Sequence, residues 1–143
     1  MRLLRKKDEN LIVEAIRSAE LATSGEVRVH MESRCEEDNP LDRAAWIFQE
    51  LGMEKTALRN GVLVYVALKS RQFCIIGDAG INGVVPADFW DSAKDLMLKE
   101  FAQGHIAQGI ASGINRVGVL LKEKFPYQDD DVNELPDAIS YGK

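Results

Sequence analysis

The spacing of apolar residues changes along the chain, and the changes mark alternating helices and strands. Residues 8–22 carry isoleucine, leucine and alanine at helical spacing and turn Glu14, Arg17 and Glu20 outward, which predicts an amphipathic helix. Residues 26–32 then alternate apolar and polar side chains, so we expect a strand with one buried face and one solvated face.

The middle of the chain predicts two more strands that lie next to each other. Residues 62–68 form a continuous apolar run, which is typical of a strand buried on both faces. After a polar turn at 69–72, residues 73–76 form a second apolar run that can return antiparallel beside the first. Residues 41–51 have helical spacing, and a helix at this place suits a right-handed crossover between parallel strands at 26–32 and 62–68.

Two further helices complete the pattern. One begins at Pro86 and ends near residue 103, and the other covers residues 106–124. We therefore expect one folded domain over residues 1–126, since a chain of 143 residues is long enough to bury one core. Residues 127–143 are predicted to form an acidic tail.

Composition and charge narrow the classes of function. The hydrophobic share of 45% and the charged share of 29% are ordinary for a soluble globular protein. The net charge is −5 and the basic residues are scattered, which argues against nucleic acid as a partner. No stretch of the sequence approaches about 20 uninterrupted apolar residues. The N-terminus does not look like a signal peptide, so we expect no membrane partner and a cytoplasmic location. Cys35 and Cys74 match no metal or redox spacing and are interpreted as ordinary residues.

Asp78 is the first candidate for a functional residue. It follows the strand at 73–76 and is flanked by Gly77 and Gly80, so the backbone can turn sharply where the carboxylate leaves the strand. Loops at strand ends are where open α/β sheets bind ligands. Asn82 and the carbonyl groups of the same loop could complete a shell of oxygen ligands. We therefore expect Asp78 and Asn82 to contribute to a divalent-cation site.

A second group of carboxylates lies in the loop after the first strand. Helix capping explains part of it, because Asn39 is a good N-cap and Asp42 falls in the first helical turn. The remaining carboxylates repel one another unless they are solvated or hold a cation, and hard cations such as calcium and magnesium prefer oxygen ligands. Two interpretations therefore stay open. The loop is simply solvated, or Glu37, Asp38 and Asp42 join Asp78 as ligands.

Two polar residues of the first strand also need an interpretation. Glu26 opens the strand after a Thr-Ser-Gly turn and could point toward the same rim as a loop carboxylate. His30 lies on the face expected to be solvated, where a histidine is more typical of a hydrogen-bonded residue than of a metal ligand.

The acidic tail contains one pattern that partly matches a calcium-binding EF-hand loop. Asp129, Asp131 and Asn133 alternate as at the start of a calcium-binding loop. Glu134 stands where such a loop requires glycine, and no glutamate follows at the proper distance, so the sequence predicts no EF-hand. The tail is interpreted as a solvated acidic segment.

Several short segments form a recognisable combination: residues 23–29, 59–65, 77–81 and 89–90, with Phe101, Gly104, Gly109, Gly113 and Ile114. Taken together, they resemble the TPM domain family over about residues 8–126. The resemblance implies an α/β fold of the three-layer αβα sandwich type, with a small mixed central sheet and helices on both faces. It also implies divalent-cation binding at loop carboxylates in some members and a weak acid phosphatase activity for the plastid branch. Asp78 is the position that best matches an acidic site of the family.

Three functions follow as hypotheses. The first is a divalent-cation-binding module with a regulatory role, in which calcium or magnesium is held by Asp78, Asp38, Asp42, Glu37 and Asn82. The second is a metal-assisted phosphatase in which Arg59 binds the phosphate and Asp78 holds metal or acts as a base. The sequence offers little for this activity, since it has no phosphate-binding glycine loop and no Cys-x5-Arg motif. The third is an interaction adaptor that uses the acidic tail or the glycine-faced last helix to bind an unknown protein partner.

Overall fold

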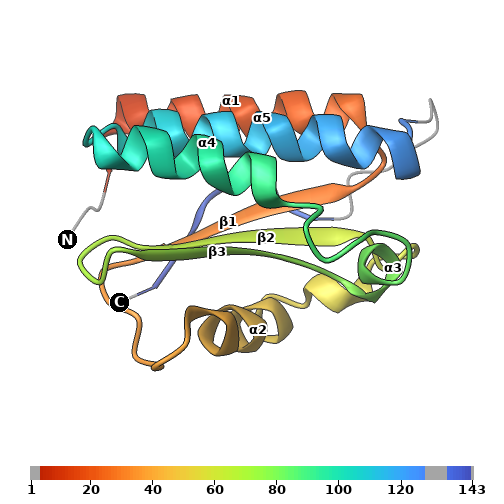
Figure 1. Ribbon diagram of the computed structural model, residues 1–143, viewed down its shortest axis with the longest axis horizontal. Helices are drawn as coiled ribbons and strands as arrows, with labels where there is room; N and C mark the ends of the chain where they lie inside the picture. Colours follow the sequence, from red (N-terminus) through yellow and green to blue (C-terminus); the bar gives the residue numbers. More distant parts are fainter. Residues whose placement is uncertain (1–3, 128–134, 143) are drawn as a thin grey trace.

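The computed structural model describes residues 4–127 and 135–142, and its centre is a four-stranded sheet between layers of helices (Figure 1). The strand order is β3-β2-β1-β4. β1 and β2 are parallel, and β2 and β3 are antiparallel, so the sheet is mixed as the sequence predicts. The strands are β1 (Glu26–Glu32), β2 (Gly61–Ala67), β3 (Gln72–Gly77) and β4 (Ser140–Tyr141).

Three helices cover one face of the sheet: α1 (Lys6–Ala22), α4 (Asp91–Ala102) and α5 (Ile106–Lys124). Their apolar stripes pack against the inward valines of β1 and β2, which forms the larger part of the core. α4 and α5 approach closely at Gly113, where a Cβ would lie 2.5 Å from Cγ of Met97. Within the described residues, no helix combines the length and the apolar character needed to cross a membrane.

The other face is covered by α2 (Pro40–Glu50) and the short 3-10 helix η1 (Met53–Lys55) (Figure 1). α2 is the crossover between the parallel strands β1 and β2, and its buried residues pack against Leu63 and Tyr65 of β2. Helices on both sides of a mixed sheet make the chain an α/β protein of the αβα sandwich type. The last helical element, α3 (Ala79–Asn82), is a single turn after β3.

The polar face of β1 is buried, whereas the alternating pattern predicted that it would be solvated. Glu26, His30 and Glu32 are 3%, 6% and 1% exposed. The pattern was read correctly as a strand, but the cover on its polar face comes from elements distant in sequence. His30 and Glu32 share their face with Tyr65, on the side where α2 packs, and β4 lies along the edge of β1.

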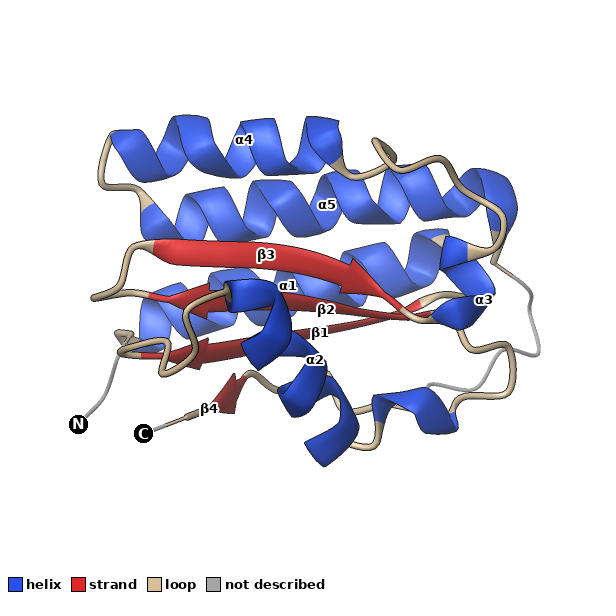
Figure 2. Cartoon of the chain, turned by 60° about the horizontal axis from the view of Figure 1, so that its bottom comes forward, coloured by secondary structure: helices blue, strands red, loops and turns tan. Residues whose placement is uncertain are grey.

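The C-terminal segment contributes to the sheet, which differs from the expectation of a tail. β4 lies beside β1 at the edge of the sheet (Figure 2). The two strands pair in parallel, with His30 opposite Ser140 and Met31 opposite Tyr141. Leu135 is 7% exposed and belongs to the core on the α2 side. Residues 128–134, which carry the alternating acidic pattern, lie outside the described residues.

Candidate functional site

Asp78 lies at the carboxyl end of β3 and is held by its neighbours in the fold. Its carboxylate accepts two hydrogen bonds from Arg59, from Nε to Oδ2 at 2.7 Å and from Nη2 to Oδ1 at 2.8 Å. Oδ1 also accepts a hydrogen bond at 2.7 Å from the backbone N–H of Ala79, which caps α3. Asp78 is 6% exposed, so its charge is buried and paired with one guanidinium.

This ion pair fixes the loop before β2 against α3. The backbone N–H of Gly80 donates to the carbonyl of Arg59 at 2.8 Å, and Arg59 itself adopts a left-handed conformation with φ of 50°. The side-chain amide of Asn82 donates to the carbonyl of Gly77 at 2.9 Å in the same corner. The structure therefore brings Asp78 and Asn82 together, in a corner where their polar groups stabilise the turn.

The other three predicted ligands lie at the opposite end of the sheet. Glu37, Asp38 and Asp42 are exposed and follow the carboxyl end of β1, whereas the backbone N–H of Asp78 donates to Gly61 at the start of β2. A seven-residue strand separates the two ends, which corresponds to about 20 Å. Asn39 caps α2 as predicted, with Oδ1 accepting from the N–H of Leu41 at 2.9 Å.

A different set of carboxyl groups converges where α1, β1 and the C-terminal segment meet. Glu20 comes from the end of α1, Glu26 opens β1, and Asp137 lies shortly before β4. Glu20 lies close enough to both of the others for a shared carboxyl proton to form a hydrogen bond between them. Nε of Arg17 lies 3.7 Å from Oδ2 of Asp137 and provides partial charge compensation at the rim. We call Glu20, Glu26 and Asp137 the carboxyl cluster.

The carboxyl cluster holds at least one proton at neutral pH. Burial, together with hydrogen bonding and repulsion from Asp137 and Glu26, raises the pKa of Glu20 to about 10. Oε2 of Glu20 accepts a hydrogen bond from the backbone N–H of Val27 at 3.3 Å. Oε1 is buried and meets no N–H or hydroxyl donor, so its only hydrogen bonds are those that a shared carboxyl proton can make. The cluster therefore carries one buried oxygen, Oε1 of Glu20, whose capacity to bind a positive charge is not used by an N–H or hydroxyl donor.

Sequence reasoning found one member of this cluster and missed two. Glu26 was considered because it follows the turn at 23–25. Glu20 was expected to point outward, and Asp137 was assigned to the tail. The turn itself is the signal that could have identified Glu20, because a reversal between a helix and a strand brings the residues just before and just after it together. Nothing local predicts Asp137, which is 111 residues from Glu26 (137 minus 26).

A second polar cluster is buried at the other end of β1. Glu32 accepts hydrogen bonds from Nε and Nη2 of Arg43, both at 2.9 Å, and another from the hydroxyl of Tyr65. Although burial opposes ionisation, these hydrogen bonds lower the pKa of Glu32. Burial lowers the pKa of His30, whose Nδ1 lies 2.9 Å from Oγ of Ser140 in β4. His30 thus joins β4 to the sheet. The negative charge of Glu32 in this cluster is compensated by the positive charge of Arg43.

Among the described residues, no three aspartate, glutamate, histidine or cysteine side chains are already arranged as a metal-binding group. Cys35 and Cys74 are both free. Burial raises the pKa of Cys74 to about 12, so its thiol stays protonated at neutral pH.

Comparison with solved structures shows which proteins share this fold. The chain is 46% identical to the BA42 protein from the psychrophilic bacterium Bizionia argentinensis, with a TM-score of 0.92 over 99% of this chain and 97% of that one. An N-terminal domain from P. gingivalis is 23% identical, with a TM-score of 0.68 over 88% of this chain and 82% of that one. The N-terminal domain of the cg2496 protein from Corynebacterium glutamicum is 16% identical, with a TM-score of 0.66 over 99% and 81%. The last two likenesses establish the fold alone.

Comparison with curated proteins finds no match. The model of the TPM domain family matches residues 1–120, which is most of the chain and includes α1, β1 and the β3–α3 corner. Together with the 46% identity to a solved structure over nearly the whole length, this match settles the classification. The chain belongs to the TPM domain family.

Proposed function

We propose that this protein binds a divalent cation, calcium or magnesium, at the carboxyl cluster of Glu20, Glu26 and Asp137. The observation that carries the proposal is the buried Oε1 of Glu20, which has no donor other than a shared carboxyl proton. A cation can replace that proton and compensate all three carboxylates at once. Calcium and magnesium both accept carboxylate oxygen ligands, so the chemistry of the donor set fits either ion.

The position of the cluster suggests what a bound cation would do to the fold. Its three ligands come from α1, β1 and the C-terminal segment, which are joined at this point by repelling groups. A cation held between them would convert that repulsion into attraction and stabilise the folded state by mass action. The proposed role is therefore that of a cation-dependent structural or regulatory module.

Competition between protons and the cation gives a first prediction. Because burial and neighbouring carboxyl groups raise the folded pKa of Glu20 from 4.5 to about 10, the native state without metal binds more protons than the unfolded state, and its stability falls as pH rises between these two values. Cation binding requires the ionised carboxylates, so affinity should rise over the same range. Denaturant unfolding of metal-stripped protein and calorimetric calcium titrations at several pH values measure the two trends. Affinity that does not depend on pH would contradict the proposal.

The substitution Glu20→Gln tests the proposed cation site specifically. The amide keeps the size of the side chain, needs no proton uptake on folding because it is neutral at every pH, and can donate a hydrogen bond to a neighbouring carboxylate. At about pH 8 the metal-stripped variant should be more stable than wild type by about 1–2 kcal/mol; this is well below the full effect of the pKa shift because solvent partly screens Glu20. Calcium affinity should fall at least about tenfold, as expected for the loss of a charged ligand. The measurements are thermal unfolding with and without calcium and a direct calcium titration.

Glu14→Gln is the matched control, because Glu14 lies on an exposed face of the same helix. It should change neither the stability at high pH nor the calcium affinity. Equal calcium affinity of the Glu20→Gln variant and wild type would remove the carboxyl cluster as the site.

The ligands predicted from the sequence form the alternative cation site to the carboxyl cluster. The substitutions Glu37→Gln, Asp38→Asn and Asp42→Asn together remove the three exposed carboxylates predicted as ligands there without touching the core, and they should leave the affinity unchanged if the carboxyl cluster is the site. Calcium-dependent amide shifts confined to residues 33–42 would instead favour the loop. Shifts confined to residues 77–83 would favour Asp78 and Asn82.

The other hypotheses stay predictions. In the phosphatase hypothesis Arg59 binds phosphate and Asp78 holds metal or acts as a base, but these two side chains bind each other. A protein partner and a cytoplasmic location also rest on the sequence alone.

A further inference from the structure

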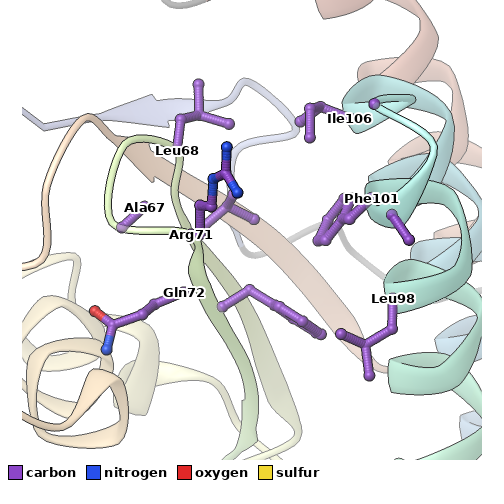
Figure 3. Close-up of a pocket in the computed structure, with 11 residues that line it drawn as sticks. Ala67, Leu68, Arg71, Gln72, Leu98, Phe101 and Ile106 are labelled. Atoms are coloured by element: carbon purple, nitrogen blue, oxygen red, sulfur yellow. The ribbon is translucent and has the colours of Figure 1, made fainter.

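A half-open cavity of about 550 Å³ lies between the β2–β3 turn and the connection from α4 to α5 (Figure 3). It is separate from the carboxyl cluster. The turn follows the end of β2 that pairs with Glu32, whereas Glu26 stands at the other end of β1. The volume falls within the range of pockets that hold small organic ligands. The cavity is therefore a second candidate binding site, for a small organic ligand.

The walls of this cavity are mainly apolar. Phe73 of β3 and Phe101 of α4 meet edge to face with ring centroids 5.2 Å apart. Leu68, Leu98 and Ile106 are among the other apolar residues of the lining, and Leu98 is 54% exposed. An apolar surface of this kind gains free energy when a ligand removes it from water.

Arg71 gives the cavity its polarity. Among the described residues that line the cavity it is the only charged one, and it forms no ion pair or side-chain hydrogen bond with other described residues. Figure 3 shows its guanidinium beside Leu68, in the space that faces Phe101 and Ile106. Arg71 is therefore the residue of the described lining that can pair with an anionic ligand.

The surroundings of the cavity do not compensate this positive charge. Asp8 and Glu100 are the nearby acidic residues to consider, because each lies beside a residue that lines this cavity or the smaller adjoining one. Asp8 pairs with Arg5 at 3.5 Å, and Glu100 pairs with His105 at 3.0 Å. The amino end of α5, which begins at Ile106 in the cavity wall, has no side-chain cap, so its dipole adds to the attraction for an anion.

We propose that this cavity binds a small amphiphile that carries one carboxylate on an apolar body. The apolar body packs against Phe73, Leu98 and Phe101, and the carboxylate accepts hydrogen bonds from Arg71. An arginine with a carboxylate is a charge-assisted pair, and its position at the mouth keeps the charged end of the ligand near water. The proposal is independent of cation binding at the carboxyl cluster.

Octanoate is the probe that tests the chemistry of the ligand, with octylammonium and acetate as comparisons. Amide NMR spectra of the full chain should show saturable shifts with millimolar octanoate at residues 66–73 and 98–106, with calcium present or absent. Octylammonium should bind more weakly because its charge is repelled by Arg71, and acetate should give no saturable shifts because it lacks the apolar body. Equal binding of octanoate and octylammonium would overturn the assignment of the carboxylate.

Two variants test the two parts of the site. Arg71→Gln should weaken octanoate binding about tenfold, the loss expected for one charge-assisted pair at a half-open site. Lys69→Gln is its matched control, since Lys69 is exposed on the same turn and lies outside the lining. Ala102→Phe fills the cavity from an exposed position at the end of α4 and should abolish binding while Arg71 is retained. Unchanged octanoate affinity in the Arg71→Gln variant, or in a folded Ala102→Phe variant, would refute the proposal.

Discussion

Replacement of Gly80 by alanine should lower the free energy of unfolding by about 3 kcal/mol or more, because no flexible side chain can move aside to admit the new methyl group. A Cβ at this position would lie 2.2 Å from the carbonyl oxygen of Leu58 and 2.6 Å from that of Arg59, both backbone atoms. The backbone would have to separate there, which breaks the hydrogen bond from Gly80 to Arg59 and weakens the Arg59–Asp78 pair. Urea unfolding followed by circular dichroism measures the loss.

Gly83→Ala provides a control three residues further along the chain. Gly83 has φ of −73°, which any residue adopts, and its Cβ would lie 3.4 Å from the carbonyl oxygen of Ala79. This variant should change stability by about 0.5 kcal/mol or less, since one tight contact is offset by the lower entropy of the unfolded chain. A Gly80→Ala variant as stable as the Gly83→Ala variant would show that the close approach of the two backbones does not matter for stability.

The elements of the fold could be predicted because they depend on local spacing. The strand at 26–32 and the helix at 106–124 have the predicted bounds, and α2 begins one residue early because Pro40 takes the first helical position after its cap. The sequence predicts the start of α4 least accurately. The apolar pattern began at Pro86, whereas the helix begins at Asp91 after a turn. Periodicity identifies the buried side of a helix but does not fix its first hydrogen-bonded turn.

The candidate site could be predicted only in part, because its residues are distant in the sequence and come together only in the folded chain. Asp78 was located correctly at a strand end, but the sequence did not reveal that Arg59, nineteen residues earlier, occupies both of its oxygens. The C-terminal segment was read as solvated because it is acidic, yet Leu135 and β4 pack on the fold. The same segment also places Asp137 beside Glu20.

Replacement of Arg43 by methionine should destabilise the protein by about 3 kcal/mol at neutral pH, the cost of leaving a buried carboxylate without its partner. Arg43 donates two hydrogen bonds to Glu32, which is 1% exposed and also accepts from Tyr65. Methionine fills a similar volume and supplies no donor. Chemical unfolding at neutral pH should show the loss directly.

The pH dependence of this loss identifies its cause. In wild type the pKa of Glu32 is below 4.5, so the pair contributes stability above that pH, and this contribution disappears as pH falls through the folded pKa. The difference between wild type and the Arg43→Met variant should therefore shrink below about pH 4.5, where Glu32 becomes protonated in both states of the variant. A difference that stays constant with pH would indicate lost packing instead of a lost charge partner.

The double variant Glu32→Gln with Arg43→Met makes the same distinction without a change of pH. A glutamine amide can donate toward Nε2 of His30, which lies 3.5 Å from Oε1 of Glu32 and meets no hydrogen-bond partner, while its oxygen still accepts from Tyr65. Arg43 also lies 4.8 Å from the ring of Trp46, and that contact is lost in both variants. The double variant should therefore be more stable than Arg43→Met alone, because it removes the uncompensated charge. A double variant less stable than Arg43→Met would show that the Glu32 carboxylate stabilises its surroundings even without Arg43. In that case the stability of this end of β1 does not depend on the ion pair.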